Sequence, residues 1–450
     1  MATSTGRWDP AGETTELLQT LIRNACVNDG TPESGHEVRN ADTLASYLGT
    51  AGFDVETYEP TPGRVTLVTR MEGTDPDAPS LCLNGHTDVV PVNEADWSRD
   101  PFGGELVDGE VWGRGAVDML NLTASFAVVL RHLASSGFRP KGDLVFLAVA
   151  DEEHGSAHGA RWMADHHADV ITTDYVLTEN GGLHGGAAGS PSVGVNVGEK
   201  GVAWRRLRLR GTPGHGSMPF KSDNALVKAA GVINALAEYR PAARVHDLWP
   251  VQVRSLGLDD EISRILLDPI ALDELLDDLP ASQGAPFLYS CTHTTLSPNV
   301  ATGSMKANVI PDEVVVEVDV RTLPGETSED VDAHLRAALG DRYDQVDVEV
   351  MMDDAASISP AHTPLWDALQ RAVSGPFPEA TIEPRLAVGF TDARIHRELG
   401  AVSYGAGLLA PTLSAADFGS RFHGNDERID VESLGLTTRL FDDVVRDLLG

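Results

Sequence analysis

The stretch DLVFLAVADEE, residues 143–153, joins a strand without a polar face to three acidic residues at its end. The unbroken apolar run from Leu144 to Ala150 predicts a central strand of a parallel sheet that helices cover on both faces. Apolar runs of strand length also occur on either side of it, in SLCLNG (80–85) and DYVLT (174–178), and a helical pattern covers 121–137. Strands that alternate with helices predict an α/β fold with a mostly parallel sheet.

The pattern of apolar and polar residues changes after Lys200, and the new pattern lasts to about residue 355. The pattern there predicts a βαββαβ unit. It consists of an alternating strand at 202–211, a helix at 224–239, two strands on either side of Pro311-Asp312, a helix at 328–339 and a strand at 346–351. The acidic helical stretch at about 252–285 reads as an elaboration of this unit, and the glycine-rich segment 181–190 as a loop. Because the α/β texture returns after Ser357, we expect residues 1–199 and 356–450 to form one domain and residues 200–355 an insertion into it.

Composition excludes several classes of function. A net charge of −34 repels phosphate backbones and anionic lipids, so we expect neither nucleic acid nor membrane as a partner. The first twenty residues lack a signal-peptide pattern, and no run of about 18 apolar residues follows, which predicts a soluble cytoplasmic protein. Three widely spaced cysteines predict reduced thiols.

Six side chains stand where catalytic or metal-binding groups are expected. His86, the pair Glu152-Glu153 and Glu179 each follow a predicted parallel strand, so the sheet should gather them at one edge. Asp118 ends a glycine-rich turn before a helix, and His423 lies in a C-terminal loop. Taken singly, the acidic triplet could be a solvated loop, Asp118 a helix cap, and His423 a packed or exposed histidine.

Together the two histidines and the carboxylates predict a mixed nitrogen and oxygen site for divalent metal, with zinc favoured and cobalt or manganese as substitutes. Asp88 is spaced to hold His86 from behind. Of the adjacent acids Glu152 and Glu153, one can bind metal while the other moves protons. Motifs of serine esterases, NTPases and dinucleotide-binding enzymes are missing from the sequence.

With these clusters in order, the chain resembles metallopeptidase family 20, which includes acetylornithine deacetylases, succinyl-diaminopimelate desuccinylases, aminoacylases and glutamate carboxypeptidases. The matching segments are NGHTDVVPV (84–92), WSRDPFGGELVDGEVWGRGAVDM (97–119), ADEEHGS (150–156), GTPGHGSMP (211–219), NVIPDEVVVEVDVRTLP (308–324) and FHGNDERI (422–429). The resemblance implies a zinc-peptidase-like catalytic domain with an inserted α+β, ferredoxin-like lid domain through which two chains form a homodimer.

The resemblance also implies a role for each site residue. His86 and Glu179 would hold one metal ion, Glu153 and His423 the other, and Asp118 would bridge both. Asp88 would support His86, Glu152 would be the general base, and His215 of the lid would stabilise the oxyanion, often in the partner's site. Asn308 and Arg321 would bind substrate, with strand-surface positions as the alternative, and the Asp118-Met119 peptide bond would be cis.

Two positions depart from the family pattern. Leu120 and Asn121 replace the usual lysine and glycine, and Glu179 stands where many relatives have aspartate.

From the site residues and the resemblance together, we expect a two-metal hydrolase that cleaves an amide bond in a small peptide or an N-acylated amino acid by a metal-bound hydroxide. The alternatives are a carbamoyl or ureido amidohydrolase on the same scaffold, and an inactive metal-retaining binding protein.

Overall fold

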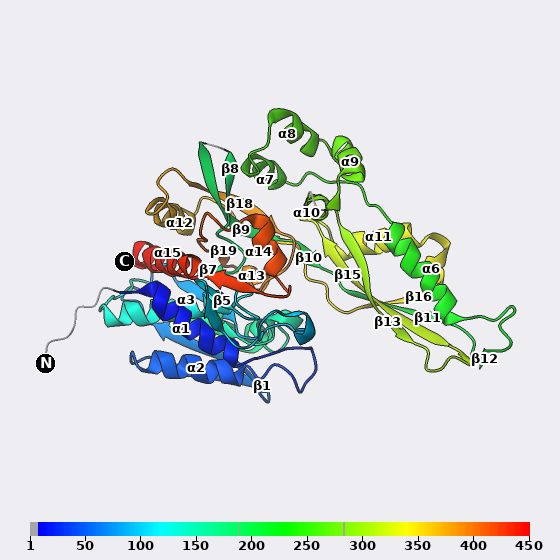
Figure 1. Ribbon diagram of the computed structural model, residues 1–450, viewed down its shortest axis with the longest axis horizontal. Helices are drawn as coiled ribbons and strands as arrows, with labels where there is room; N and C mark the ends of the chain where they lie inside the picture. The colour runs from blue at the N-terminus through cyan, green and yellow to red at the C-terminus, as the bar shows by residue number, and fades with distance from the viewer. Residues whose placement is uncertain (1–7, 188, 282–283) are drawn as a thin grey trace.

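The computed structural model describes residues 8–450, apart from residues 188 and 282–283. Figure 1 shows a large α/β body that carries the C-terminus, and a narrower body of strands and helices that extends away from it. Within the described ranges, no helix has both the length and the apolar character needed to cross a membrane.

The larger body is built on a ten-stranded sheet in the described part of the chain, with the order β1-β2-β6-β3-β7-β19-β9-β17 and with β8 and β18 paired to β9. The strands are Val55–Thr61 (β1), Arg64–Met71 (β2), Leu81–His86 (β3), Leu144–Val149 (β6), Tyr175–Thr178 (β7), His184–Ala187 (β8), Ser190–Glu199 (β9), Ser357–Ile358 (β17), Thr381–Ala387 (β18) and Val402–Gly405 (β19). Four neighbours, β6, β3, β7 and β19, run parallel, so their carboxyl ends share one edge.

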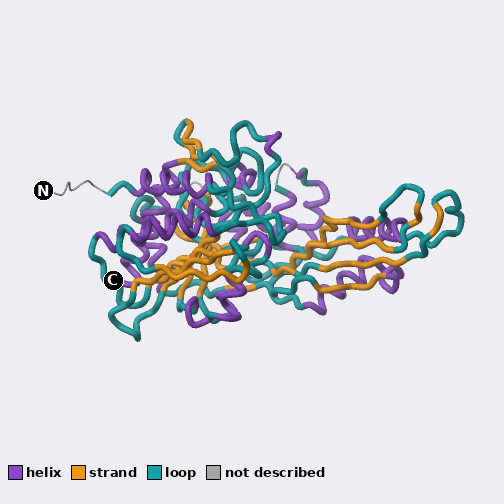
Figure 2. The backbone as a smooth tube through the Cα atoms, turned by 90° about the horizontal axis from the view of Figure 1, so that it is seen from below, coloured by secondary structure: helices purple, strands orange, loops and turns teal. Residues whose placement is uncertain are grey.

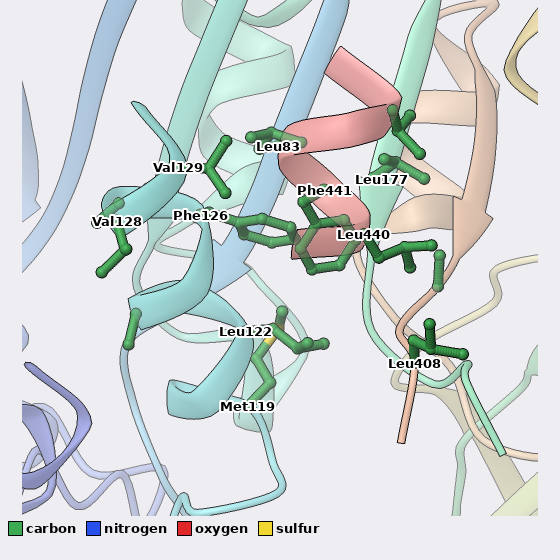
Figure 3. Packing of buried hydrophobic residues seen from close by; sticks show 14 of the residues in the cluster. Leu83, Met119, Leu122, Phe126, Val128, Val129, Leu177, Leu408, Leu440 and Phe441 are labelled. Carbon is green, nitrogen blue, oxygen red and sulfur yellow. The ribbon is translucent and has the colours of Figure 1, made fainter. Parts of the chain in front are cut away.

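Helices cover both faces of this sheet, as its apolar strands require. One face packs against α1 (Pro10–Arg23), α2 (Val38–Gly49), α3 (Leu120–Ser135), α12 (Pro364–Ser374) and α15 (Val431–Leu449), and the other against α4 (Ala160–His166), α5 (Ala168–Ile171) and α13 (Ala393–Glu398). Phe126 of α3 and Phe441 of α15 meet in the first core with ring centroids 4.7 Å apart, and Met119 reaches the same core (Figure 3).

The second body has an antiparallel sheet in the order β13-β15-β11-β16, in which β10 also pairs with β15. Its strands are Gly201–Val202 (β10), Arg205–Arg210 (β11), Thr295–Gly303 (β13), Glu313–Thr322 (β15) and Val346–Val350 (β16), and α6 (Ala225–Glu238) and α11 (Ser328–Leu339) pack on it. Figure 2 shows these strands as a long arm. The order confirms the ferredoxin-like βαββαβ prediction, while the boundaries at 199/200 and 355/356 stay predictions.

Two segments differ from or refine the sequence prediction. Within the segment predicted as a loop, 181–190, β8 pairs with the start of β9 as an antiparallel hairpin, and Gly186 and Gly189 adopt the positive φ of 89° and 84°. Glycine richness signals backbone freedom, which a hairpin uses as readily as a loop. The acidic stretch forms the helices α7 (Trp249–Ser255), α8 (Asp260–Leu266), α9 (Pro269–Asp278) and α10 (Ala285–Thr292).

Short elements complete the frame of the site. A three-stranded sheet joins β4 (Glu105–Val107), β5 (Glu110–Trp112) and β20 (Arg428–Asp430), the 3-10 turn η2 spans Glu152–His154, and α14 spans Ala415–Arg421. At the far end of the arm, β12 (Gly214–His215) pairs with β14 (Val309–Ile310).

Candidate metal centre

Three adjacent strands deliver most of the predicted ligands to one edge of the large sheet. His86 is the last residue of β3, Glu152 and Glu153 lie in η2 directly after β6, and Glu179 follows β7. Because β6, β3 and β7 are neighbours that run parallel, these side chains converge at their carboxyl ends, as expected.

Asp118 and His423 reach the same place from two loops. Asp118 precedes α3, and its peptide bond to Met119 is cis, as the resemblance implied. One carboxylate oxygen, Oδ1, lies 3.1 Å from His86 Nε2, and the other, Oδ2, lies 3.3 Å from His423 Nε2. The two oxygens of Asp118 therefore face two different histidines.

The remaining carboxylates surround the two histidines. Glu152 Oε2 and Glu179 Oε1 each lie 4.0 Å from His86 Nε2, and Glu153 Oε2 lies 3.2 Å from His423 Nε2. His86, Glu152 and Glu179 form one group whose ligand atoms all lie within 4.8 Å of each other, and His86, Asp118 and Glu153 form a second. His423 is 55% exposed, so the cluster opens to solvent on its side.

The electrostatics of the cluster fit a divalent cation. Burial and the charge of Asp118 raise the pKa of Glu153 to about 7, and the same two causes raise that of Glu179. Hydrogen bonds to Asp118 and Glu153 raise the pKa of His423 to about 10. Buried carboxylates that repel one another stabilise any positive charge between them.

One buried atom points to the same conclusion. Glu153 Oε1 is buried and accepts no hydrogen bond within the described residues. An ionised oxygen buried without a partner is costly, and a bound cation removes that cost. The donor set of imidazole nitrogens and carboxylate oxygens fits zinc and related divalent ions.

Asp88 lies behind His86, as predicted. His86 Nδ1 is 3.0 Å from the backbone carbonyl of Asp88 and 3.5 Å from its Oδ1. With Nδ1–H donating to that carbonyl, the lone pair of Nε2 faces the cluster. Burial lowers the pKa of His86, but its hydrogen bonds to Asp118 and Asp88 outweigh burial, and the net shift is upward.

Two supporting residues were missed from the sequence, although both lie in the matching segments. Glu427 Oε1 accepts from the backbone N–H of Val117 at 2.7 Å and of Asp118 at 3.2 Å. Arg114 forms an ion pair with Glu427 at 2.7 Å and donates to the His423 carbonyl at 3.4 Å. Both side chains are buried, so the pair ties the Asp118 loop to the His423 loop.

A third supporting group lies beside Glu152. Asp392, in the loop before α13, is buried and accepts from the Ser156 hydroxyl at 2.5 Å. Burial raises the pKa of Glu152 well above its usual range, and the negative charge of Asp392 adds to the rise while His86 opposes it. The sequence around Asp392 contains no motif that would have predicted its place beside Glu152.

The predicted arm residues lie apart from the cluster. His215 is exposed on β12 at the far end of the arm (Figure 1), where its Nδ1 lies 2.7 Å from Ser217 Oγ. Asn308 is beside it, since the Gly216 N–H donates to the Asn308 carbonyl at 2.8 Å. Arg321 lies near the other end of the arm, bonded to Asp319 Oδ1 at 2.7 Å and 4.9 Å from the centre of the Phe390 ring. Within one chain, the fold does not bring His215 and Asn308 to the cluster.

Two histidines and four carboxylates gathered at the carboxyl edge of a parallel sheet, with two groups that could each hold a metal ion, are the arrangement of a metal-dependent hydrolase. Residues 82–447 match the profile of peptidase family M20/M25/M40. The chain belongs to this family of dinuclear-metal hydrolases, which act on carbon–nitrogen bonds.

Individual relatives agree with this assignment. The chain is 28% identical to a succinyl-diaminopimelate desuccinylase of Alkalilimnicola ehrlichii over 97% of this chain and all of the relative. It is 26% identical to a probable carboxypeptidase S-like 2 of Dictyostelium discoideum over 82% of this chain and 71% of the relative. The crystal structure of the metallo-carboxypeptidase Sso-CP2 of Sulfolobus solfataricus shares the fold, with a TM-score of 0.72 at 18% identity over 97% of this chain and 99% of that one.

Proposed function

We propose that the protein hydrolyses an amide bond in a small peptide or an N-acylated amino acid with the help of two divalent ions, with zinc as the proposed metal. The observation that carries the proposal is Asp118, whose two oxygens face His86 and His423 separately. His86 and Glu179 would hold one ion and Glu153 and His423 the other, with Asp118 between them. Bound there, the ions would polarise the substrate carbonyl and acidify a water molecule.

The chain's own residues supply the proton transfers. Glu152 is buried at the cluster and is the candidate base that takes a proton from the attacking water and passes it to the leaving amine. Asp88 is a positioning residue, because it fixes the orientation of His86 without reaching the ligand side of the ring.

The arm is the proposed lid, spanning residues 200–355. His215 and Asn308 share one exposed hairpin, so they would act in the site of a partner subunit, His215 on the oxyanion and Asn308 on the substrate. Arg321 would bind a substrate carboxylate once it leaves Asp319. A homodimer through this lid, zinc as the native metal and a cytoplasmic location stay predictions.

The substrate class is supported by the named relatives, among them the desuccinylases and the aminoacylase-1 of Sus scrofa, to which the chain is 32% identical over 50% of its length and 55% of the relative. Such names describe enzymes that remove an acyl group from an amino acid, and this chain would do the same. The identity of the acyl group is part of the test below.

Elemental analysis of the purified protein, combined with amine release from dipeptides and N-acyl amino acids, tests the proposal. We expect up to two divalent ions per chain, loss of activity on chelation, and recovery when zinc or cobalt is returned. Release of ammonia from ureido acids would support the carbamoyl alternative instead. A chain that binds no divalent ion and is indifferent to chelators would refute the proposal.

A further inference from the structure

A buried polar cluster lies directly behind the candidate metal centre, and the N-terminal part of the chain supplies it. It consists of Asn28, Glu37 and Arg64, which are 4%, 0% and 2% exposed, and we name these three the N-terminal support. All three precede residue 82, where the match to the family profile begins. Their contacts lead to Asp88 and Asp151, which are also buried.

Asn28 uses both ends of its amide. Its Nδ2 donates to Asp88 Oδ2 at 2.8 Å and to Asp151 Oδ1 at 3.0 Å, while its Oδ1 accepts from Arg64 Nη2 at 2.9 Å. Donors on one end meet two carboxylates and the acceptor on the other end meets a guanidinium. Among side chains, only a primary amide offers two N–H donors and a carbonyl acceptor at once.

Arg64 supplies the positive charge for this group of acids. Its Nη1 lies 2.7 Å from Glu37 Oε1 and 3.6 Å from Asp151 Oδ1. Glu37 Oε1 in turn lies 3.3 Å from the backbone N–H of Asp151, which donates to it. Gly35 leaves space for the pair, because a Cβ there would stand 2.2 Å from Arg64 Nη1.

The support acts on the turn that presents the catalytic acids. Asp88 Oδ1 accepts from the Glu152 N–H at 3.3 Å, and Asp88 Oδ2 accepts from the Glu153 N–H at 3.2 Å. Asp151 itself holds the left-handed conformation, with φ of 63°. A side chain other than glycine adopts this conformation at a cost, so the surrounding contacts must hold it there.

We infer that Asn28 and Arg64 are positioning residues of the metal centre, acting through Asp88 and Asp151. They fix the carboxylate of Asp88 and the backbone of residues 151–153. In this way they set the positions of His86, Glu152 and Glu153 relative to one another. The inference rests on the metal centre proposed above, but it assigns a role to a part of the chain outside the family match.

The test uses Asn28→Ala and the double variant Arg64→Gln, Glu37→Gln, which removes both members of the ion pair and leaves neither charge buried alone. Gln252→Ala is the matched control, because Gln252 is a buried amide in α7 that donates to the Leu386 carbonyl at 3.4 Å. Zinc affinity is measured in competition with a chromophoric chelator. We expect Asn28→Ala to bind zinc about 10- to 100-fold more weakly, and the control to match the wild type.

Hydrogen exchange provides a second readout that needs no metal. In chelated protein, the amides of Glu152 and Glu153 should lose protection in Asn28→Ala and keep it in Gln252→Ala. Unchanged zinc affinity and unchanged exchange in a folded Asn28→Ala protein would overturn the inference. Wild-type protein that binds no zinc would reject the metal centre, and hydrogen exchange alone would then decide whether the support holds the turn.

Discussion

Glu152 and Glu179 stand at the same distance from His86 Nε2, 4.0 Å, so geometry alone does not separate a base from a ligand. Their places in the chain differ, since Glu152 follows β6 in the turn held by Asp88, whereas Glu179 follows β7. The proposed roles assign proton transfer to Glu152 and metal binding to Glu179.

Substitution of each acid by its amide separates these roles. Glu152→Gln should retain metal and lose about 10²- to 10⁴-fold in kcat, because an amide cannot take up the proton. Glu179→Gln and Glu153→Gln should instead bind metal more weakly. Turnover numbers and metal content of the purified variants are the measurements, with the exposed Glu261→Gln as control. Full activity of Glu152→Gln would contradict the assigned mechanism.

Three of the proposed ligands, His86, Glu153 and Glu179, could be found from the sequence because each lies at the end of a strand that the apolar runs predict. Asp118 and His423 lie in loops, and their place in the set was implied by the family resemblance. Arg114, Glu427 and Asn28 could not be found in this way, since their partners lie far away along the chain and no spacing marks the contact. The contacts of such residues depend on which loops meet in the folded protein, and no local pattern in a single sequence shows which loops those are.

At the scale of elements, apolar runs and helical periodicity predicted the sheet, its covering helices and the βαββαβ unit. The hairpin of β8 and β9 was missed, because glycine-rich residues have little side-chain pattern to read. Lys200 was likewise passed over as a boundary residue, although it is 1% exposed and its Nζ donates to the carbonyls of Ser290 and His293 at 2.9 and 2.7 Å.

Lys200 should make stability depend on pH. Burial lowers its pKa to about 8 from an ordinary value of 10.5. Between these values the unfolded chain carries a proton that the folded protein has lost, so the free energy of unfolding should rise with pH, by a total on the order of 3 kcal/mol.

Chemical denaturation at several pH values, compared between wild type and Lys200→Met, isolates this contribution, because both proteins share every other titrating group. The Met variant should lack the rise between pH 8 and 10.5, and the exposed Lys141→Met should keep it. Parallel pH profiles for wild type and Lys200→Met would contradict the assignment.

The contact between α3 and α15 should carry a large share of the stability of the catalytic body. Phe441→Ala removes a fully buried ring that packs on Phe126 and should lower the free energy of unfolding by about 3–5 kcal/mol. Phe220→Ala is the control, because that ring is 86% exposed and its loss should change little. Urea denaturation measures both variants, and equal costs would show that the core contact has been misjudged.

At the scale of the whole molecule, the position of His215 bears on the proposed homodimer. The hairpin of β12 and β14 stands at the far end of the arm (Figure 1), while the metal cluster lies in the large body. Completion of the site by a partner subunit, as proposed above, would account for both positions. This arrangement stays a prediction that comes from the family resemblance and not from composition.

Mixing two inactive variants tests it. Glu152→Gln lacks the proposed base, and His215→Ala lacks the proposed oxyanion residue, so each alone should be nearly inactive. A mixed dimer has one site with both groups intact, so co-expression should restore about a quarter of the wild-type activity. Activity that stays at the level of the separate variants would show that His215 does not act across subunits.

The order of the proposed metal-binding residues along the chain also bears on how the protein is made. His86 is synthesised before His423, with the entire arm between them. A polypeptide interrupted shortly before residue 423, by early termination or by a protease, contains most of the catalytic body and still lacks one histidine facing Asp118. On the proposed ligand set, an unfinished copy would therefore stay inactive until synthesis has passed residue 423.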